Sequence, residues 1–343
     1  MCLGGHAAVL PRTDRRGSDA GNRGLQPVVK ARYSIVIPVY KNEGSIASLL
    51  QALDGMAATL DAPLEVIFVV DGSPDASFAR LESGLRTVTF QARLILLSRN
   101  FGAFAAIRCG LAEATGEFIG VMAADLQEPP SLMRDFFSAL TSKPLDVVFG
   151  QRLSRHDPGL SKIASNLFWS IYRRLVQPDV PEGGVDVFAL TAPFRDRLIA
   201  LGEANSSLLG LLFWLGGRRE FVGYTRLERQ HGRSAWTLKK KVTYLLDSVF
   251  AFSDLPVRVL MGTGLAGLGV AFLLGLVVLA ARVFGTYQVP GYAGSMLAIL
   301  FFGALNTFGI GIVGNYAWRA YENTKQRPLN IVSMRLDFPG KPQ

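Results

Sequence analysis

The stretch with the clearest chemical potential is AADLQEPP (123–130), which follows the apolar run EFIGVM (117–122). Acidic residues at the carboxyl end of a buried strand are where α/β proteins often hold a metal ion or phosphates. Two carboxylates spaced two residues apart would make a divalent-metal site. Here Asp125 occupies the second of these positions, and Ala123 stands where the first would be. The stretch is therefore a working metal site, a reduced one, or only a turn.

Three other apolar runs are also followed directly by a cluster of polar residues. They are PVYKNE (38–43), DGSPD (71–75) and SRNFG (98–102). One such cluster alone is more often a turn with a helix N-cap. Four in succession predict a polar cleft of the size that a nucleotide needs.

The elements that must position these clusters alternate regularly over residues 33–150. We expect strands at 34–39, 65–70, 93–98, 117–122 and 146–150, and helices at 43–58, near 74–86, near 102–115 and from Ser131. Continuous apolar runs that are each followed by a helix predict an α/β fold with a mostly parallel sheet covered on both faces. Ligands bind at the carboxyl ends of such strands, which is where the polar clusters lie.

Two long apolar segments near the C-terminus predict a membrane hairpin. Residues 259–281 and 293–318 contain no charged residue over 23 and 26 positions, and GTYQVPG (285–291) joins them. Roughly 20 apolar residues span a bilayer. The alternative is a pair of buried core helices, which two such lengths in succession do not favour.

The segment before the hairpin has helical periodicity. After the cationic start KKK (239–241), five apolar residues share one helix face: Val242, Leu245, Leu246, Val249 and Phe250. This pattern predicts an amphipathic helix at the membrane surface. Packing of the same face against the preceding domain is the alternative.

The net charge of +9 has an informative distribution. Lys and Arg residues flank the hairpin on both sides and are absent from its connecting loop. By the positive-inside rule, both termini are then cytoplasmic. The excess of basic residues suits binding to anionic lipid or to phosphate, and a nucleic-acid partner is not needed to explain it. Cys2 and Cys109 have no metal or redox spacing, and residues 1–32 lack an apolar run of signal-peptide length.

An ordered set of motifs carries a family resemblance. IVIPVYKNEGSI, VVDGSPD, LSRNFGAFAAIRCGL, ADLQEPP and the two apolar spans resemble the family 2 glycosyltransferases of the GT-A fold, over roughly residues 33–325. The branch that looks most similar contains the dolichol-phosphate mannose synthases and the bacterial polyprenyl-phosphate glucosyltransferases. The resemblance implies a GT-A (Rossmann-like) nucleotide-sugar-binding domain, amphipathic interface helices and a two-helix transmembrane hairpin. The implied reaction moves a sugar, with inversion, from a nucleotide sugar to a polyprenyl phosphate.

The implied organisation has five parts: a disordered basic extension (1–32), a GT-A domain (33–235), a membrane-interface segment (236–256), two transmembrane helices (257–320) and a cytoplasmic tail (321–343). The expected location is the bacterial inner membrane, with the catalytic domain cytoplasmic. UDP is the expected nucleotide and undecaprenyl phosphate the expected acceptor. Small residues of the second span predict a homo-oligomer: Gly303, Gly309, Gly311 and Gly314.

The resemblance also implies roles for individual residues. Base and ribose would be held by residues of the first two clusters: Pro38, Tyr40, Glu43, Asp71 and Gly72. Asp125 and Gln127 would hold Mg²⁺ or Mn²⁺ against the diphosphate. Arg152 would face phosphate, and the basic loop RQHGRS would bring Arg229 and Ser234 to the lipid phosphate and the donor.

The chemistry fits these residue types. A divalent cation with oxygen ligands neutralises the charge that develops on a leaving diphosphate. A phosphate monoester is already anionic, so the acceptor needs positioning more than a general base. Arginine binds phosphate oxygens in a bidentate fork. The histidines, His6, His156 and His231, are then expected to be surface residues.

Three departures from the family pattern leave alternatives open. Val70 replaces an acid before DGS, Ala123 the first acid of D-x-D, and Ala235 a lysine of the basic loop. These losses favour a non-catalytic, degenerate membrane subunit that binds lipid or a partner. A processive polysaccharide synthase is a further alternative, since QHGRSAW (230–236) is similar to a Q-x-x-R-W motif, but two spans are few for a polymer channel. We interpret AADLQEPP as a reduced metal site in a working enzyme.

Overall fold

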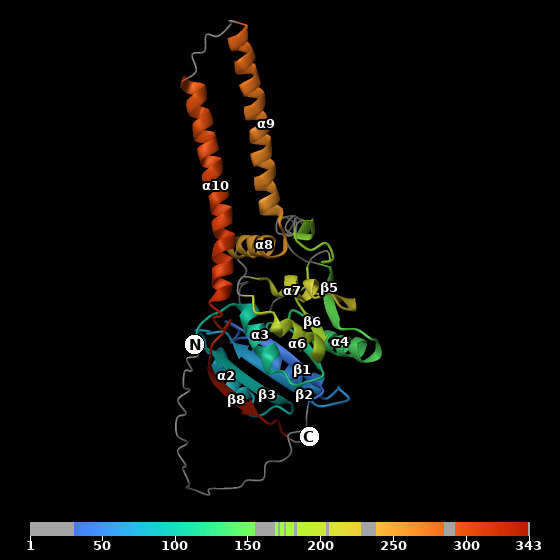
Figure 1. Cartoon of the computed structure of the whole chain (residues 1–343). Coiled ribbons are helices and arrows are strands. Elements are labelled where there is room, and N and C mark those ends of the chain that lie inside the picture. Colours follow the sequence, from blue (N-terminus) through green and yellow to red (C-terminus); the bar gives the residue numbers. More distant parts are fainter. Residues whose placement is uncertain are drawn as a thin grey trace, which may run out of the picture.

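The chain folds into an α/β part from which two long helices project (Figure 1). The computed structural model describes residues 31–154, 169–170, 172–174, 176–181, 184–203, 206–227, 238–284 and 292–341.

A single mixed sheet organises the α/β part. Within the described residues it has eight strands in the order β7-β5-β6-β4-β1-β2-β3-β8. Their bounds are β1 Tyr33–Val39, β2 Leu64–Val70, β3 Gln91–Leu97, β4 Phe118–Val121, β5 Val147–Ser154, β6 Phe188–Thr191, β7 Arg219–Thr225 and β8 Val332–Phe338. The neighbours β4, β1, β2 and β3 are parallel, as the sequence predicts. Strands β6 and β8 are antiparallel to their neighbours, so the sheet is less parallel than expected.

Helices cover both faces of the sheet. One hydrophobic core packs α1 (Ile46–Ala57), α2 (Ser77–Gly84) and α4 (Ser131–Ser142) against one face. A second core packs α3 (Ala103–Glu113), α6 (Ala192–Ala200) and α7 (Leu208–Trp214) against the other. Alternate residues of β1 enter different cores: Ile35 and Ile37 the first, and Val36 the second. This two-sided burial explains why the central strands are continuous apolar runs.

The C-terminal segment differs from the expected tail. Residues 321–343 contain the end of α10 (Tyr292–Thr324) and then β8, which pairs with β3 at the edge of the sheet (Figure 1). Arg93 of β3 binds Asp337 at 2.7 Å across this pair. Local sequence cannot predict such pairing, because the two strands are more than 200 residues apart.

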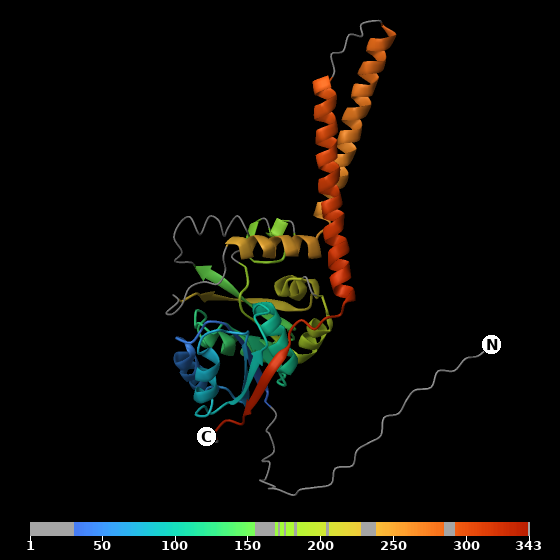
Figure 2. The ribbon, with the colours of Figure 1, turned by 90° about the vertical axis from the view of Figure 1, so that its left-hand side faces the viewer.

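The amphipathic segment forms α8 (Leu238–Phe252), which lies across the α/β part near the foot of the hairpin (Figure 2). One side of this helix packs against the domain, which was the alternative expectation, and the expected position at a membrane surface stays a prediction. Val249 is buried in the second core, and the Tyr244 ring stacks on Tyr172. In contrast, Val242 and Leu246 leave about half of their surface exposed, at 49% and 50%.

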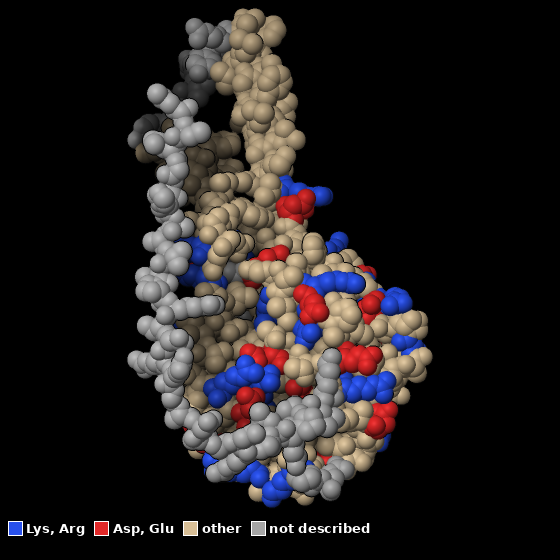
Figure 3. Space-filling model, turned by 60° about the horizontal axis from the view of Figure 1, so that its bottom comes forward, with Lys and Arg blue, Asp and Glu red and all other residues tan. Residues whose placement is uncertain are grey.

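The hairpin consists of α9 (Leu255–Val283) and α10. Both helices are long and apolar enough to cross a membrane, and none of the most apolar window of α9 is buried by the rest of the chain. Charged side chains gather over the α/β part and at the foot of the hairpin, and the visible face of the hairpin above is almost free of them (Figure 3). Apolar surface of this extent is unfavourable in water by about 25 cal/mol per Å².

We predict that β8 stabilises the α/β part. Leu336 of β8 packs against the first core, so Leu336→Asp would place a carboxylate in an apolar contact. We expect the free energy of unfolding to fall by about 2–3 kcal/mol, measured by denaturation in detergent. Ser333→Asp, at an exposed position of the same strand, is the control and should change it by no more than about 0.5 kcal/mol. Equal stability of the two variants would contradict the packing role of β8.

Candidate active site

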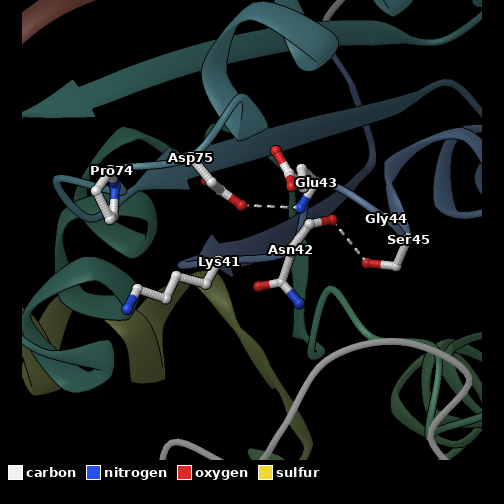
Figure 4. A pocket seen from close by; sticks show the side chains of 7 residues that line it. All are labelled: Lys41, Asn42, Glu43, Gly44, Ser45, Pro74 and Asp75. Atoms are coloured by element: carbon white, nitrogen blue, oxygen red, sulfur yellow. Dashed lines mark hydrogen bonds between the residues drawn. The ribbon is translucent and has the colours of Figure 1, made fainter.

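The loops that follow β1 and β2 are hydrogen-bonded to each other and line an open pocket. The pocket has a volume of about 470 Å³ and is lined by residues 41–45, Pro74 and Asp75 (Figure 4). The Glu43 amide donates to the Asp75 carboxylate at 3.1 Å, and the Glu43 carboxylate accepts from the Ala76 amide at 3.0 Å. Glu43 is thus used to order this rim and remains exposed to solvent.

Asp71 holds the loop between β3 and α3. Its two carboxylate oxygens accept hydrogen bonds from the amides of Phe101 and Gly102, at 2.7 and 2.8 Å. The side chain is buried, and this burial raises its pKa against the opposing effects of the two amides and of Arg99. The second and third polar clusters are therefore fixed to each other through one carboxylate.

Gly72 permits this close approach. Its φ is +56°, and a Cβ atom built on it would lie 2.4 Å from the carbonyl carbon of Arg99 and 2.5 Å from the amide nitrogen of Asn100. Backbone atoms cannot give way as a flexible side chain can. The conformation also disfavours any residue with a Cβ.

The Asp125 turn completes the rim. Ser45 donates to the Ala124 carbonyl at 2.9 Å, which joins the turn to the loop after β1. Leu126 has a φ of +54°, an unusual value for a bulky residue that marks local strain. The backbone amide of Gln127 donates a hydrogen bond to Asp125 Oδ1 at 3.3 Å, and this bond closes the turn. The four polar clusters predicted from the sequence therefore adjoin one another.

Asp125 is the residue of the turn that could hold a divalent cation. Asp125 is half-buried at the rim, and Ala123 supplies no ligand. Within the described residues, no group of three or more His, Cys, Asp or Glu side chains is placed to enclose a metal. Mg²⁺ is commonly held by one or two carboxylates together with substrate phosphates and water, so one carboxylate is sufficient here.

Glu128, beside the turn, points into the protein. Its side chain is 1% exposed and accepts a hydrogen bond from the Ala123 amide. Burial and the neighbouring Asp125 raise the pKa of Glu128, and Arg226 and Arg152 oppose that rise. This acid does not replace the one that is absent at position 123, because it lies beneath the turn instead of on its open side.

Arg152 is also less open than its expected phosphate-facing role requires. Its side chain is 9% exposed and forms an ion pair with Asp186. The more exposed Arg226 lies 3.9 Å from the same carboxylate, and its side chain is 31% exposed. Two arginines and two acids, Glu128 and Asp186, thus form a charge-compensated cluster behind the Asp125 turn.

The remaining predicted residues divide into two groups. Pro38 and Tyr40 lie half-buried at the end of β1, where the resemblance places them. Arg229 and Ser234 lie outside the described residues, which stop at Leu227 and resume at Leu238. For all the predicted site residues, a part in ligand binding stays a prediction.

Sequence reasoning missed Asp186 and Arg226 as parts of the site. Arg226 directly follows β7, which lies outside the five expected strands, so its position after a strand gave no signal in the sequence. Asp186 follows a Gly-rich turn and precedes β6, an antiparallel strand that was not predicted. Without that strand, nothing in the sequence places Asp186 beside Arg152.

Comparisons with known proteins identify the family of this chain. The sequence model described as "Glycosyl transferase family 2" matches residues 34–198. The "Uncharacterized glycosyltransferase sll0501" of Synechocystis sp. is 31% identical over 88% of this chain and 94% of its own length. The chain belongs to glycosyltransferase family 2. It is a glycosyltransferase with an α/β domain.

Other relatives of this glycosyltransferase have more specific names. The "Prophage bactoprenol glucosyl transferase homolog" of Escherichia coli strain K12 is 29% identical over 88% of this chain and 98% of the relative. The "Bactoprenol glucosyl transferase" of Shigella phage SfX is 28% identical over 89% and 99%. Among solved structures, glucosyl-3-phosphoglycerate synthase from Mycobacterium tuberculosis matches with a TM-score of 0.43 and 17% identity, over 64% of this chain and 80% of that one.

We predict that Gly72→Ala separates the loops that form the rim. The clash with Arg99 and Asn100, added to the left-handed φ, should lower the free energy of unfolding by about 2–4 kcal/mol. The free energy of unfolding is measured by denaturation in detergent. Gly55→Ala in α1 is the control, since a Cβ there meets nothing within 4 Å, and it should be neutral or stabilising by up to about 1 kcal/mol. Wild-type stability of Gly72→Ala would refute this account of the close approach.

Proposed function

We propose that this glycosyltransferase moves a hexose from a UDP-linked sugar to a polyprenyl phosphate at the cytoplasmic face of a bacterial inner membrane, with inversion at the anomeric carbon. The observation that carries the proposal is the anchoring of α9 and α10. These helices of membrane-crossing length are joined at one end to α8, which packs on the α/β part, and at the other end to β8, a strand of its sheet. A donor site attached to a bilayer in this way suits an acceptor that is itself a lipid.

The names of the relatives support a polyprenyl phosphate as the acceptor. Proteins called bactoprenol glucosyl transferases align over 88–89% of this chain and 98–99% of their own length. Bactoprenol is a polyprenyl lipid, and its phosphate is the proposed nucleophile. Undecaprenyl phosphate is the acceptor that we propose for a bacterial enzyme.

The proposed reaction breaks the bond between the sugar C1 and the diphosphate and forms a bond from C1 to a lipid phosphate oxygen. The acceptor oxygen is already anionic, so no side chain has to remove a proton. Asp125, with donor oxygens and water, would hold the divalent cation that stabilises the leaving UDP. Asp71 and Gly72 fix the loops around the nucleotide, and Arg226 places a positive charge beside the turn.

The proposed orientation places the α/β part in the cytoplasm. Arg258 starts the first span, and Arg319, Lys325 and Arg327 follow the second. At the far end of the hairpin there is a single basic residue, Arg282. This excess of positive charge on the side of the α/β part supports a cytoplasmic location.

We predict that Asp125→Asn greatly reduces transfer. The variant keeps the shape of the side chain but removes the one carboxylate of the turn. We expect kcat for transfer of label from UDP-hexose to undecaprenyl phosphate to fall about 10²–10³-fold, and Mn²⁺ to bind more weakly in the presence of UDP.

The matched control is Asp135→Asn, an exposed aspartate of α4, which should keep wild-type turnover. Chelation with EDTA should abolish transfer by the wild type. Full activity of Asp125→Asn would contradict the metal assignment. An inactive wild type that also fails to bind UDP with Mn²⁺ would favour the non-catalytic membrane subunit.

A further inference from the structure

Arg319, near the end of α10, is bound to α8. Its Nη2 donates a hydrogen bond to Oδ1 of Asp247 in α8 at 2.6 Å, and its Nε donates to Oδ1 of Asn315, one turn earlier in α10, at 2.8 Å. The carbon atom of the guanidinium lies 5.3 Å from the centre of the Phe250 ring, which also belongs to α8. The Arg319 side chain is 15% exposed, so most of this cation is enclosed by protein.

A second contact between the same two helices lies beside the ion pair. The Tyr316 ring packs edge-on against the Phe250 ring, with 5.4 Å between the ring centres. The Tyr316 hydroxyl donates to the Ser253 carbonyl at 3.4 Å. Figures 1 and 2 both show the end of α8 against α10. Polar and aromatic contacts thus hold α10 on α8.

Helix α8 is in turn packed on the α/β part, close to the rim formed by the four polar clusters. The Tyr244 hydroxyl and Ser207 Oγ share a hydrogen bond at 2.7 Å, and the Tyr244 ring lies 5.7 Å from the ring of Phe104 in α3. Phe104 is two residues from Gly102, whose amide binds Asp71. Because close-packed interiors transmit displacement, a movement of α8 would reach this part of the rim.

The contact at Arg319 supplies a constraint that the pairing of β8 with β3 does not. Strand β8 fixes the place where the chain from α10 joins the sheet, and residues 325–331 connect the two elements. A helix that is attached at one end can still change its tilt. Arg319 holds α10 more than one turn before its last residue, Thr324. Packing against a neighbouring helix sets the tilt of a membrane helix.

A second ion pair at the foot of the hairpin provides a comparison. Arg258 and Asp254, both near the start of α9, are 2.8 Å apart, but their side chains are 75% and 66% exposed. Solvent screens such a pair. Arg319 and Asp247 join two different helices, and the charged hydrogen bond between them is better shielded from water.

We infer that the Arg319–Asp247 pair fixes the tilt of α10 on α8 and so holds the rim at one height above the bilayer, which makes Arg319 a positioning residue for an acceptor embedded in the membrane. This inference rests on the proposed function. It gives Arg319 a role beyond the positive charge that orients the hairpin.

The first test compares two acceptors with the full-length protein in lipid vesicles. Undecaprenyl phosphate is embedded in the bilayer, and a short polyprenyl phosphate dissolves in water. Asp247→Asn and Arg319→Met should each lower kcat/KM for undecaprenyl phosphate about tenfold, because the reacting atoms lose their alignment. The double variant should be no worse than either single variant, since both remove the same interaction. Values for the soluble acceptor should stay within about twofold of wild type, because it reaches the site from solution at any tilt.

The matched control is Asp254→Asn, the same change in the exposed pair. It should keep both acceptors within about twofold of wild type, because screened surface pairs contribute little.

A distance measurement does not depend on transfer. Spin labels at Ser138→Cys in α4 and Ala304→Cys in α10, two exposed positions, report the angle between the α/β part and the hairpin by electron paramagnetic resonance. Cys2→Ser removes one native thiol, and the other, Cys109, is buried. We expect a narrow distribution of distances with the native pair and with Asp254→Asn, and a broad one with Asp247→Asn.

Three results would overturn the inference. They are an equal loss of activity with both acceptors, additive effects of Asp247→Asn and Arg319→Met on kcat/KM, and a distance distribution that stays narrow in Asp247→Asn. If the wild type transfers sugar to neither acceptor, the proposed function fails, but the spin-label distances still decide whether the ion pair fixes α10.

Discussion

The pairing of β8 with β3 is the constraint on which the arrangement of this protein depends. The chain leaves the α/β part through α8, passes through α9 and α10, and returns to the edge of the same sheet. Only a short segment separates the end of α10 at Thr324 from Val332 of β8, and within it Ile331 accepts a hydrogen bond from the Ser98 amide at 2.9 Å. The hairpin is therefore attached to the edge of the sheet, beside the polar cluster that follows β3.

A second constraint is the compensation of charge behind the Asp125 turn. Arg152, Arg226, Glu128 and Asp186 lie together, and the two arginines oppose the rise in the pKa of Glu128 that burial and Asp125 cause. Removing one member of a buried ionic group typically costs about 3–5 kcal/mol, because its partner is left uncompensated. The cluster lies behind the Asp125 turn, in which Ala123 stands where the resemblance implies a second acid. In the proposed reaction, the donor diphosphate contributes the ligands that Ala123 cannot.

Much of the fold could be predicted from local pattern. The apolar runs of β1 to β5 and the helices between them lie within a few residues of their expected positions, because continuous burial and helical periodicity are local signals. Strands β6, β7 and β8 were not predicted, since their pairing is determined by distant partners. The four polar clusters were expected at one rim and do adjoin, but the burial of Arg152 and the hydrogen bond from Arg226 to Gln127 depend on Asp186 and β7. No spacing rule in the sequence brings those elements together.

The central claim is that this glycosyltransferase uses a lipid phosphate as its acceptor. The most direct measurement incubates the purified protein with undecaprenyl phosphate and a panel of radiolabelled nucleotide sugars, with Mg²⁺, with Mn²⁺ and with EDTA, and follows label into the organic phase. The account predicts metal-dependent label in the lipid from one donor, linked to UDP. The contrary result is label that stays in the aqueous phase for every donor, although the protein still binds UDP with Mn²⁺. That result would contradict the claim that a lipid phosphate is the acceptor.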